Sequence, residues 1–128
     1  MIAHLDHLVL TTRDETACVH FYGTVLGMRV ETFGEGRKAF VFGAQKINLH
    51  IAGKEFEPKA QHPTPGALDL CFIASMALTQ VMARLNAYGI PIECGPIART
   101  GAQGPIRSVY VRDPDANLIE ISEYLPQA

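Results

Sequence analysis

Apolar and polar residues alternate along several short stretches of the chain, and glycine or other turn-forming residues separate these stretches. A period of two is typical of β-strands with one buried face. The alternation predicts strands at residues 4–12, 28–33, 37–42, 46–51, 67–74, 91–94, 106–111 and 118–124. The glycine-rich stretch 95–105 is predicted to be a loop between two of these strands.

Apolar residues at helical spacing predict two helices, one after the first strand and one after the fifth. Thr12 and Glu15 have the spacing of a capping box at the start of the first helix, and Gly27 suits its end. Ser75 is placed to cap the second helix, which is predicted to end at Gly89.

The order strand, helix, strand, strand, strand therefore occurs twice, as in an internal duplication. Residues 53–66 lie between the two copies, lack periodicity and contain three prolines, so they are predicted to be a linker. We expect a single α+β domain over residues 1–128. It would be built of module 1 (about 1–52), the linker (53–66) and module 2 (67–125), each module having a curved, mostly antiparallel four-stranded sheet with an outer helix.

The last predicted strand has a carboxylate at its centre. Alternation puts Leu118, Glu120 and Ser122 on one face, after a turn rich in aspartate and proline at residues 112–116. A carboxylate among apolar strand residues is costly unless its charge is compensated. Glu120 is therefore either a metal ligand or a residue on a half-exposed strand in contact with water.

Four polar residues occupy such mid-strand positions: His7, His50, Asp69 and Glu120. Imidazole and carboxylate ligands around one point suit Zn²⁺, Fe²⁺, Mn²⁺, Ni²⁺ or Co²⁺. Each residue alone has an ordinary structural explanation, such as a core histidine or an aspartate that caps a loop. Their joint occurrence at matching positions of the two modules favours a metal site.

Composition excludes several classes of function. The net charge of −2 gives no reason to expect nucleic acid as a partner, and no apolar run approaches a membrane span. The first residues lack the features of a secretory signal, so we expect a cytoplasmic protein. The three cysteines, Cys18, Cys71 and Cys94, form no C-x-x-C pair and are predicted to be buried thiols rather than disulfides.

Three stretches resemble one family: LDHLVL at residues 5–10, FYGTVLG at 21–27 and DPDANLIE at 113–120. They are similar to the vicinal oxygen chelate superfamily, which includes glyoxalase I, extradiol dioxygenases and bleomycin-binding proteins. Further stretches, at residues 45–50, 54–58, 69–71 and 95–101, are similar to the glyoxalase domain-containing protein 5 group. The resemblance covers nearly the whole chain and implies the paired βαβββ fold.

The resemblance implies that His7 and Glu120 stand at the first-strand and last-strand metal positions. Asp69 stands where metal-binding members usually have histidine, and the fourth-strand ligand falls on Asn48. His50 shares the face of Asn48 and is an alternative ligand, which leaves Asn48 as a substrate-binding candidate. The family also implies a divalent metal cofactor and a homodimer.

We expect a metal-dependent enzyme that acts on a small substrate with neighbouring oxygens, as a lyase, an isomerase or a dioxygenase. Glu120 would also be the catalytic base, with Asp69 as the rival base. Arg99 and Arg107 could hold an anionic group of the substrate, or be surface residues. The alternatives are a metal-free binding protein of the bleomycin-resistance type, and a structural or regulatory dimer with a vestigial site.

Overall fold

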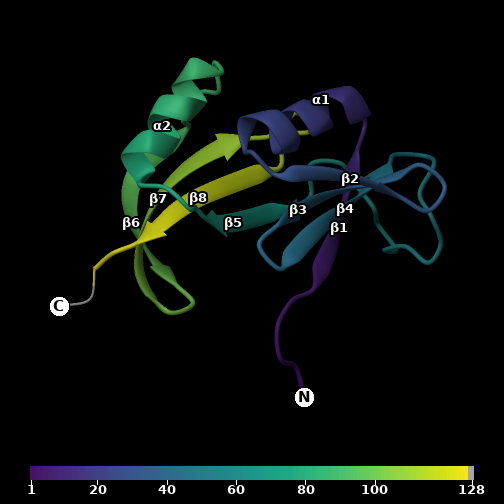
Figure 1. Cartoon of the computed structure of the whole chain (residues 1–128), viewed down its shortest axis with the longest axis horizontal. Helices are drawn as coiled ribbons and strands as arrows, with labels where there is room; N and C mark the ends of the chain where they lie inside the picture. Colours follow the sequence, from purple (N-terminus) through teal and green to yellow (C-terminus); the bar gives the residue numbers. More distant parts are fainter. Residues whose placement is uncertain (127–128) are drawn as a thin grey trace. The chain divides into compact units, whose positions relative to one another are not determined.

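The computed structural model describes residues 1–126 and divides the chain into two units, Met1–Leu68 and a second that begins at Asp69. Each unit contains one four-stranded sheet (Figure 1). In both units the elements follow the order strand, helix, strand, strand, strand. The predicted α+β fold of two βαβββ modules is therefore confirmed.

Unit 1 contains β1 (His7–Thr12), α1 (Glu15–Val19), the π-helical segment η1 (His20–Val25), β2 (Arg29–Phe33), β3 (Arg37–Phe42) and β4 (Gln45–Ile51). Its strands lie in the order β1-β4-β3-β2. β1 runs parallel to β4, and the other neighbours are antiparallel. The sheet is therefore mixed, because β1 and β4 are joined through the rest of the module rather than by a hairpin.

Helical residues cover one face of the unit 1 sheet. Phe21, Tyr22 and Val25 are buried, and the Tyr22 ring stacks on Phe40 of β3 with 5.2 Å between centroids. The helix cap differs from the prediction. Asp14 caps α1 by accepting a hydrogen bond from the Ala17 N–H, whereas Thr12 is the last residue of β1. The strand extends up to the cap, so the expected capping box does not form.

Unit 2 repeats this topology with β5 (Asp69–Ile73), α2 (Leu78–Ala87), β6 (Cys94–Gly101), β7 (Gly104–Arg112) and β8 (Leu118–Tyr124). Its strands lie in the order β5-β8-β7-β6, with β5 parallel to β8. α2 packs against β7 and β8. Ala77 rather than the expected Ser75 is its N-cap, and the Leu78 N–H donates to Glu123 Oε2 of β8 at 2.9 Å.

The predicted loop at residues 95–105 is a β-hairpin instead. β6 and β7 pair as far as Gly101 and Gly104, so only two residues form the turn. Glycine also permits close packing of these strands, because a Cβ atom at Gly95 would collide with the Ser108 carbonyl oxygen. The glycines that indicated a loop are thus hairpin residues.

The turn before β8 is built around one buried aspartate, Asp113. Its Oδ1 accepts from the N–H groups of Asp115 and Asn117, both at 2.9 Å, and its Oδ2 accepts from Asn117 Nδ2 at 2.7 Å. Asn117 is only 1 % exposed. The predicted turn is confirmed, and its side chains set the point at which β8 begins.

Ala116 has a φ of 67° in this turn, in the left-handed region. This region costs a residue with a Cβ atom roughly 1–2 kcal/mol. Ala116→Gly should relieve that strain, partly offset by roughly 0.4–1 kcal/mol of extra freedom in the unfolded chain. We expect a net gain of about 0.5 kcal/mol in the free energy of unfolding, measured by urea denaturation. A loss of stability would show that contacts of the Ala116 methyl group stabilise the fold by more than the backbone strain destabilises it.

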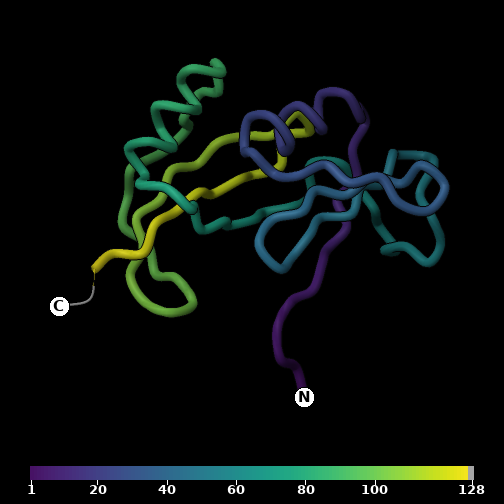
Figure 2. The backbone as a smooth tube through the Cα atoms, viewed as in Figure 1, coloured from purple at the N-terminus to yellow at the C-terminus, as the bar shows by residue number. Residues whose placement is uncertain are grey.

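A long stretch without helix or strand follows β4 and ends unit 1, which Figure 2 shows as an extended loop over residues 52–68. It contains the predicted linker.

Among residues 1–126, no helix is both long enough and apolar enough to cross a membrane.

Candidate functional site

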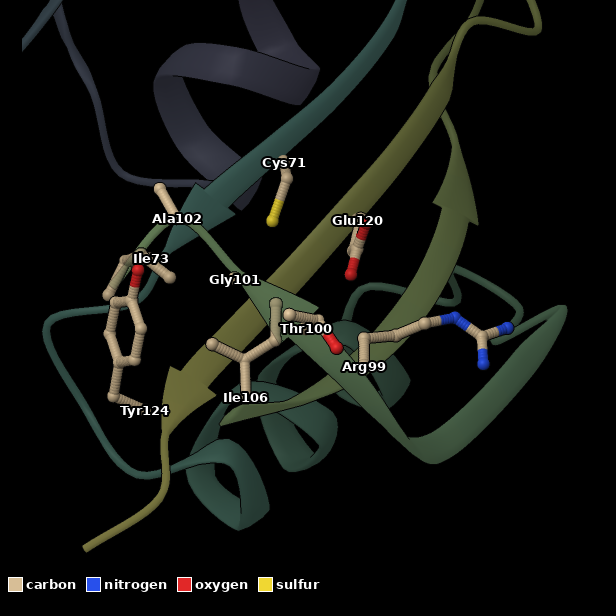
Figure 3. A pocket seen from close by; sticks show the side chains of 9 residues that line it. All are labelled: Cys71, Ile73, Arg99, Thr100, Gly101, Ala102, Ile106, Glu120 and Tyr124. Carbon is tan, nitrogen blue, oxygen red and sulfur yellow. The ribbon is translucent and has the colours of Figure 1, made fainter. Parts of the chain in front are cut away.

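Glu120 lies at the centre of the open face of the unit 2 sheet, which α2 does not cover. Register pairs it with Cys71 of β5 and Tyr110 of β7. A pocket of about 340 Å³ opens on this face (Figure 3). It is lined by Cys71, Ile73, Arg99, Thr100, Gly101, Ala102, Ile106, Glu120 and Tyr124. The predicted carboxylate therefore belongs to a concave surface large enough for a small molecule.

Two buried hydroxyls hold the Glu120 carboxylate. Ser108 Oγ donates to Glu120 Oε2 at 2.6 Å, and Ser122 Oγ lies 3.4 Å from the same oxygen. The two hydroxyls are 2.6 Å apart, and both serines are fully buried. Both bonds use Oε2 and leave Oε1 for another partner.

The Cys71 thiol lies beside this carboxylate. Its Sγ is 3.4 Å from Ser122 Oγ, and Figure 3 shows Cys71 and Glu120 projecting from neighbouring strands on the same side. Burial raises the pKa of the Cys71 thiol, and the negative charge of Glu120 raises it further, although the Ser122 hydrogen bond acts in the opposite direction. Cys71 is therefore a neutral thiol at neutral pH.

This arrangement makes a prediction about thiol reactivity. The thiolate is the form that alkylates, so the raised pKa of Cys71 should slow its reaction with iodoacetamide at pH 8, and Cys94, which is also exposed, is the internal control. Glu120→Gln removes the charge that raises the Cys71 pKa and should speed the reaction of Cys71 while leaving Cys94 unchanged. Mass spectrometry of each peptide measures both rates. Equal acceleration at both cysteines would show that the charge of Glu120 does not act specifically on Cys71.

The cysteines themselves differ from the prediction. All three are free thiols, as expected, but only Cys18 is buried, and Cys71 and Cys94 are exposed. Cys71 is exposed because it is on the open face of β5, and Cys94 because it begins the edge strand β6.

The two predicted substrate-binding arginines fall in different places. Arg99 lines the pocket, but Figure 3 shows its guanidinium pointing away from the pocket centre. Its Nε donates to the Tyr110 hydroxyl at 2.9 Å. Arg107 does not share the Glu120 face, because it pairs with Glu123, and residues of odd and even number in β7 point to opposite sides. Arg107 therefore does not belong to this pocket.

Asp69 is exposed and stands on the same face as Glu120. Its register partner is Leu118, which makes Asp69 and Glu120 diagonal neighbours on parallel strands. Such neighbours have Cα atoms roughly 7–8 Å apart, within reach of long side chains.

His7 and Asn48 occupy the corresponding positions in unit 1. His7 pairs with Lys46, and Asn48 lies two residues further along β4, so Asn48 is the diagonal neighbour of His7 on the open face. Asp69 and Glu120 have the same relationship in unit 2. His7 Nδ1 is 2.8 Å from Asp6 Oδ2, and this hydrogen bond holds the pKa of the Asp6 carboxyl below its ordinary value. A carboxylate on one ring nitrogen is the usual support of a metal-binding histidine, and it leaves Nε2 as the ligand atom.

His50 is not brought together with His7. Thr11 is the register partner of His50, four residues along β1 from His7. At about 3.3 Å per residue this separates the two imidazoles by roughly 13 Å, too far for one metal ion. His50 is 3 % exposed, and burial followed by the charge of Arg37 lowers its pKa. His50 is therefore a buried neutral imidazole rather than a partner of His7.

Within residues 1–126, no group of three or more histidine, cysteine, aspartate and glutamate side chains is close enough to hold a metal ion. Each sheet by itself supplies two diagonal positions, His7 with Asn48 and Asp69 with Glu120. The sequence prediction missed Ser108 and Cys71. Both could have been found only from the register of β8 with β7 and β5, whereas Ser122 follows from its spacing to Glu120.

The sequence matches the model of the Glyoxalase/Bleomycin resistance protein/Dioxygenase superfamily over residues 4–121. It is 54 % identical to "Virulence protein STM3117" of Salmonella typhimurium over 98 % of this chain and 87 % of that protein. It is 55 % identical to "Glyoxalase domain-containing protein RDO1" of Mycosarcoma maydis, over 96 % of this chain and 69 % of that protein.

Solved structures agree with this match. The crystal structure of the Salmonella typhimurium virulence protein has a TM-score of 0.95 and 54 % identity, covering 98 % of this chain and 99 % of that one. The crystal structure of a lactoylglutathione lyase from Agrobacterium tumefaciens has a TM-score of 0.73 and 25 % identity, covering 96 % of this chain and 95 % of that one.

Proposed function

Because the chain belongs to the Glyoxalase/Bleomycin resistance protein/Dioxygenase superfamily, we propose that it is a metal-dependent enzyme acting on a small substrate with two neighbouring oxygens. Members of this superfamily commonly use divalent metal ions. The reaction class is a lyase, an isomerase or a dioxygenase. The observation that carries the proposal is Glu120, a supported carboxylate at the centre of an open sheet face that borders a pocket.

The ligand set follows from the diagonal positions. In unit 2, Glu120 and Asp69 would supply carboxylate oxygens to a metal ion, and in unit 1 His7 would supply an imidazole nitrogen. One feature of unit 1 fits metal binding: the Asp6 carboxylate supports His7 through its Nδ1. The paired carboxylate oxygens of unit 2 suit Mn²⁺ or Fe²⁺ better than they suit Zn²⁺.

When bound, such an ion would act as a Lewis acid toward the oxygens of the substrate. The chain's own residues would do the remaining work. Glu120 can accept a proton through Oε1 while Ser108 and Ser122 fix the orientation of its other oxygen. Ile73 and Ile106 supply apolar lining, and the neutral Cys71 thiol adds no second negative charge beside the carboxylate.

The test is turnover of small α-oxo and catechol-type compounds by purified protein supplied with Fe²⁺, Mn²⁺, Ni²⁺ or Zn²⁺, with and without O₂. A lyase or isomerase needs no O₂, whereas a dioxygenase should work with Fe²⁺ and require it. The proposal expects turnover with at least one metal and none after chelation. Turnover that survives chelation would contradict it.

One observation favours a second candidate, a metal-free binding protein of the bleomycin-resistance type. Asp69 and Asn48 stand where metal-binding relatives are expected to carry other ligands, and Asp69 is exposed. In that case the pocket would bind an organic ligand equally well with and without chelator. This result separates the two candidates.

We also propose that the protein forms a homodimer. Val9 on the open face of unit 1 is 42 % exposed, and Ile73 on the open face of unit 2 is 50 % exposed, which is costly for apolar strand residues of a lone chain. Light scattering at micromolar concentration should give twice the chain mass of 14.0 kDa. A mass equal to that of one chain would contradict the dimer.

A further inference from the structure

Three polar side chains on the open face of the unit 1 sheet each have one buried atom without a hydrogen-bond partner among the described residues. Arg37 Nε, Asn48 Oδ1 and His50 Nδ1 are shielded from solvent and have no hydrogen-bond partner among the described residues. Asn48 is 7 % exposed and His50 is 3 % exposed. An unpaired buried polar group costs roughly 1–3 kcal/mol, so three on one face require an explanation.

Register brings the three residues together. Asn48 pairs with Ala39 of β3. Continuing this antiparallel register by two residues puts Arg37 opposite His50, on the same face of the sheet. The charge of Arg37 contributes to lowering the pKa of His50, as expected for neighbours.

The Arg37 guanidinium has aromatic neighbours instead of a carboxylate. It lies 5.0 Å from the Phe33 ring centroid and 4.4 Å from that of Phe56, and it forms no ion pair within the described part of the chain. Lys46 Nζ is 4.4 Å from the same Phe33 ring, which adds a second positive charge. The rings occupy the flat sides of the guanidinium, so its N–H donors are directed along its edge.

Two carboxylates approach the cluster but are engaged elsewhere. Glu55 and Glu57 both influence the charge on His50. Glu55 accepts a hydrogen bond from the Gly53 N–H at 2.6 Å, and Glu57 pairs with Lys59 at 2.6 Å. They reduce the positive potential of Arg37 and Lys46 without satisfying the three unpaired atoms.

The unpaired atoms define the ligand that would complete them. Arg37 Nε–H can only donate and Asn48 Oδ1 can only accept, while a neutral imidazole can donate from one ring nitrogen. A carboxylate supplies acceptors, and a hydroxyl beside it supplies the donor. We propose that Arg37, Asn48 and His50 form a binding subsite for a small 2-hydroxycarboxylate, whose carboxylate accepts from Arg37 and His50 and whose hydroxyl donates to Asn48.

Phe56 covers this subsite. Its ring packs against both Arg37 and His50, the latter at 5.8 Å between centroids. It belongs to the stretch that follows β4, which has no helix or strand, and it is 39 % exposed. We expect entry of the ligand to displace this ring, because no helix or strand holds the residue. The subsite needs no metal and goes beyond the proposed function.

The test is a titration of the full chain, with chelator present, followed by NMR of the Arg37 Nε–H and the His50 ring. The probes are glycolate, acetate and the neutral glycolamide. Glycolate should bind with a dissociation constant on the order of 1 mM. Acetate should bind about tenfold more weakly because Asn48 then lacks a donor, and glycolamide should not bind.

Matched variants assign the effect to these residues. Arg37→Met keeps an apolar stem against the rings and should abolish binding of both anions, whereas Arg29→Met, which removes an exposed arginine of the same unit, should not. Asn48→Leu should abolish the preference for glycolate over acetate. The proposal is overturned if neither anion shifts these resonances at about 100 mM, or if glycolate and acetate bind equally to the unaltered chain. Loss of binding in Arg29→Met equal to that in Arg37→Met would also overturn it. Because chelator is present throughout, failure here leaves the metal-dependent function untouched.

Discussion

Asp113→Ala is expected to lower the free energy of unfolding by about 3 kcal/mol. The change removes three hydrogen bonds to a buried carboxylate and leaves the Asn117 side-chain donor, 1 % exposed, without that acceptor. Hydrogen bonds to a charged acceptor are about twice as strong as neutral ones. For a chain of this size the midpoint of thermal unfolding should fall by roughly 10 °C.

Asp113→Asn is the matched control for this prediction. It keeps Oδ1 as an acceptor for two backbone N–H groups but turns the second oxygen into a donor that faces Asn117 Nδ2. We therefore expect an intermediate loss of about 1.5 kcal/mol. Urea denaturation measures both variants. A loss below about 1 kcal/mol in Asp113→Ala would show that the turn is held mainly by its backbone.

Glu120→Gln should lower the affinity for a divalent metal by more than about 100-fold, since loss of a supporting residue alone costs 10–100-fold. Glutamine keeps the length of the side chain and an oxygen that can accept from Ser108, so the fold should persist. Thermal unfolding with and without added Mn²⁺ or Fe²⁺ checks this, because a ligand that binds the native state alone raises the unfolding temperature.

The matched control for Glu120 is Glu93→Gln. Glu93 is exposed and pairs with Arg112 at 3.1 Å, away from the lining of the pocket. Its variant should keep the full thermal shift produced by metal. An equal shift in Glu120→Gln and in the unaltered chain would remove Glu120 from the ligand set, and full turnover by Glu120→Gln would remove it from the mechanism.

Much of the fold could be predicted because local alternation determines which residues form strands. The two runs of strand, helix and three strands, and the shared face of Glu120 and Ser122, follow from period-two patterns. The hairpin at residues 95–105 could not, since Gly95 is required by contact with Ser108, and a contact between strands does not appear in composition. Likewise, Asp14 rather than Thr12 caps α1 because Thr12 is still the last residue of β1.

The candidate site was predicted only in part because it depends on register. Alternation puts Asn48 and His50 on one face, but only pairing with β1 shows that His50 lies opposite Thr11 and away from His7. The position of Arg107 could not be predicted for the same reason, because its partner in β8 determines whether it shares the Glu120 face. Arg37 and Phe56, which surround His50, carry no motif and emerge only from three-dimensional contacts.

The most direct measurement is the metal content of the chain purified without chelator, together with its thermal unfolding after addition of Mn²⁺, Fe²⁺, Co²⁺, Ni²⁺ or Zn²⁺. Metal-dependent function predicts about one bound ion per chain. It also predicts an increase in the unfolding temperature with at least one metal, and loss of both effects in His7→Ala and Glu120→Gln. Protein that contains no metal and shows the same unfolding temperature with all five ions would contradict the proposal.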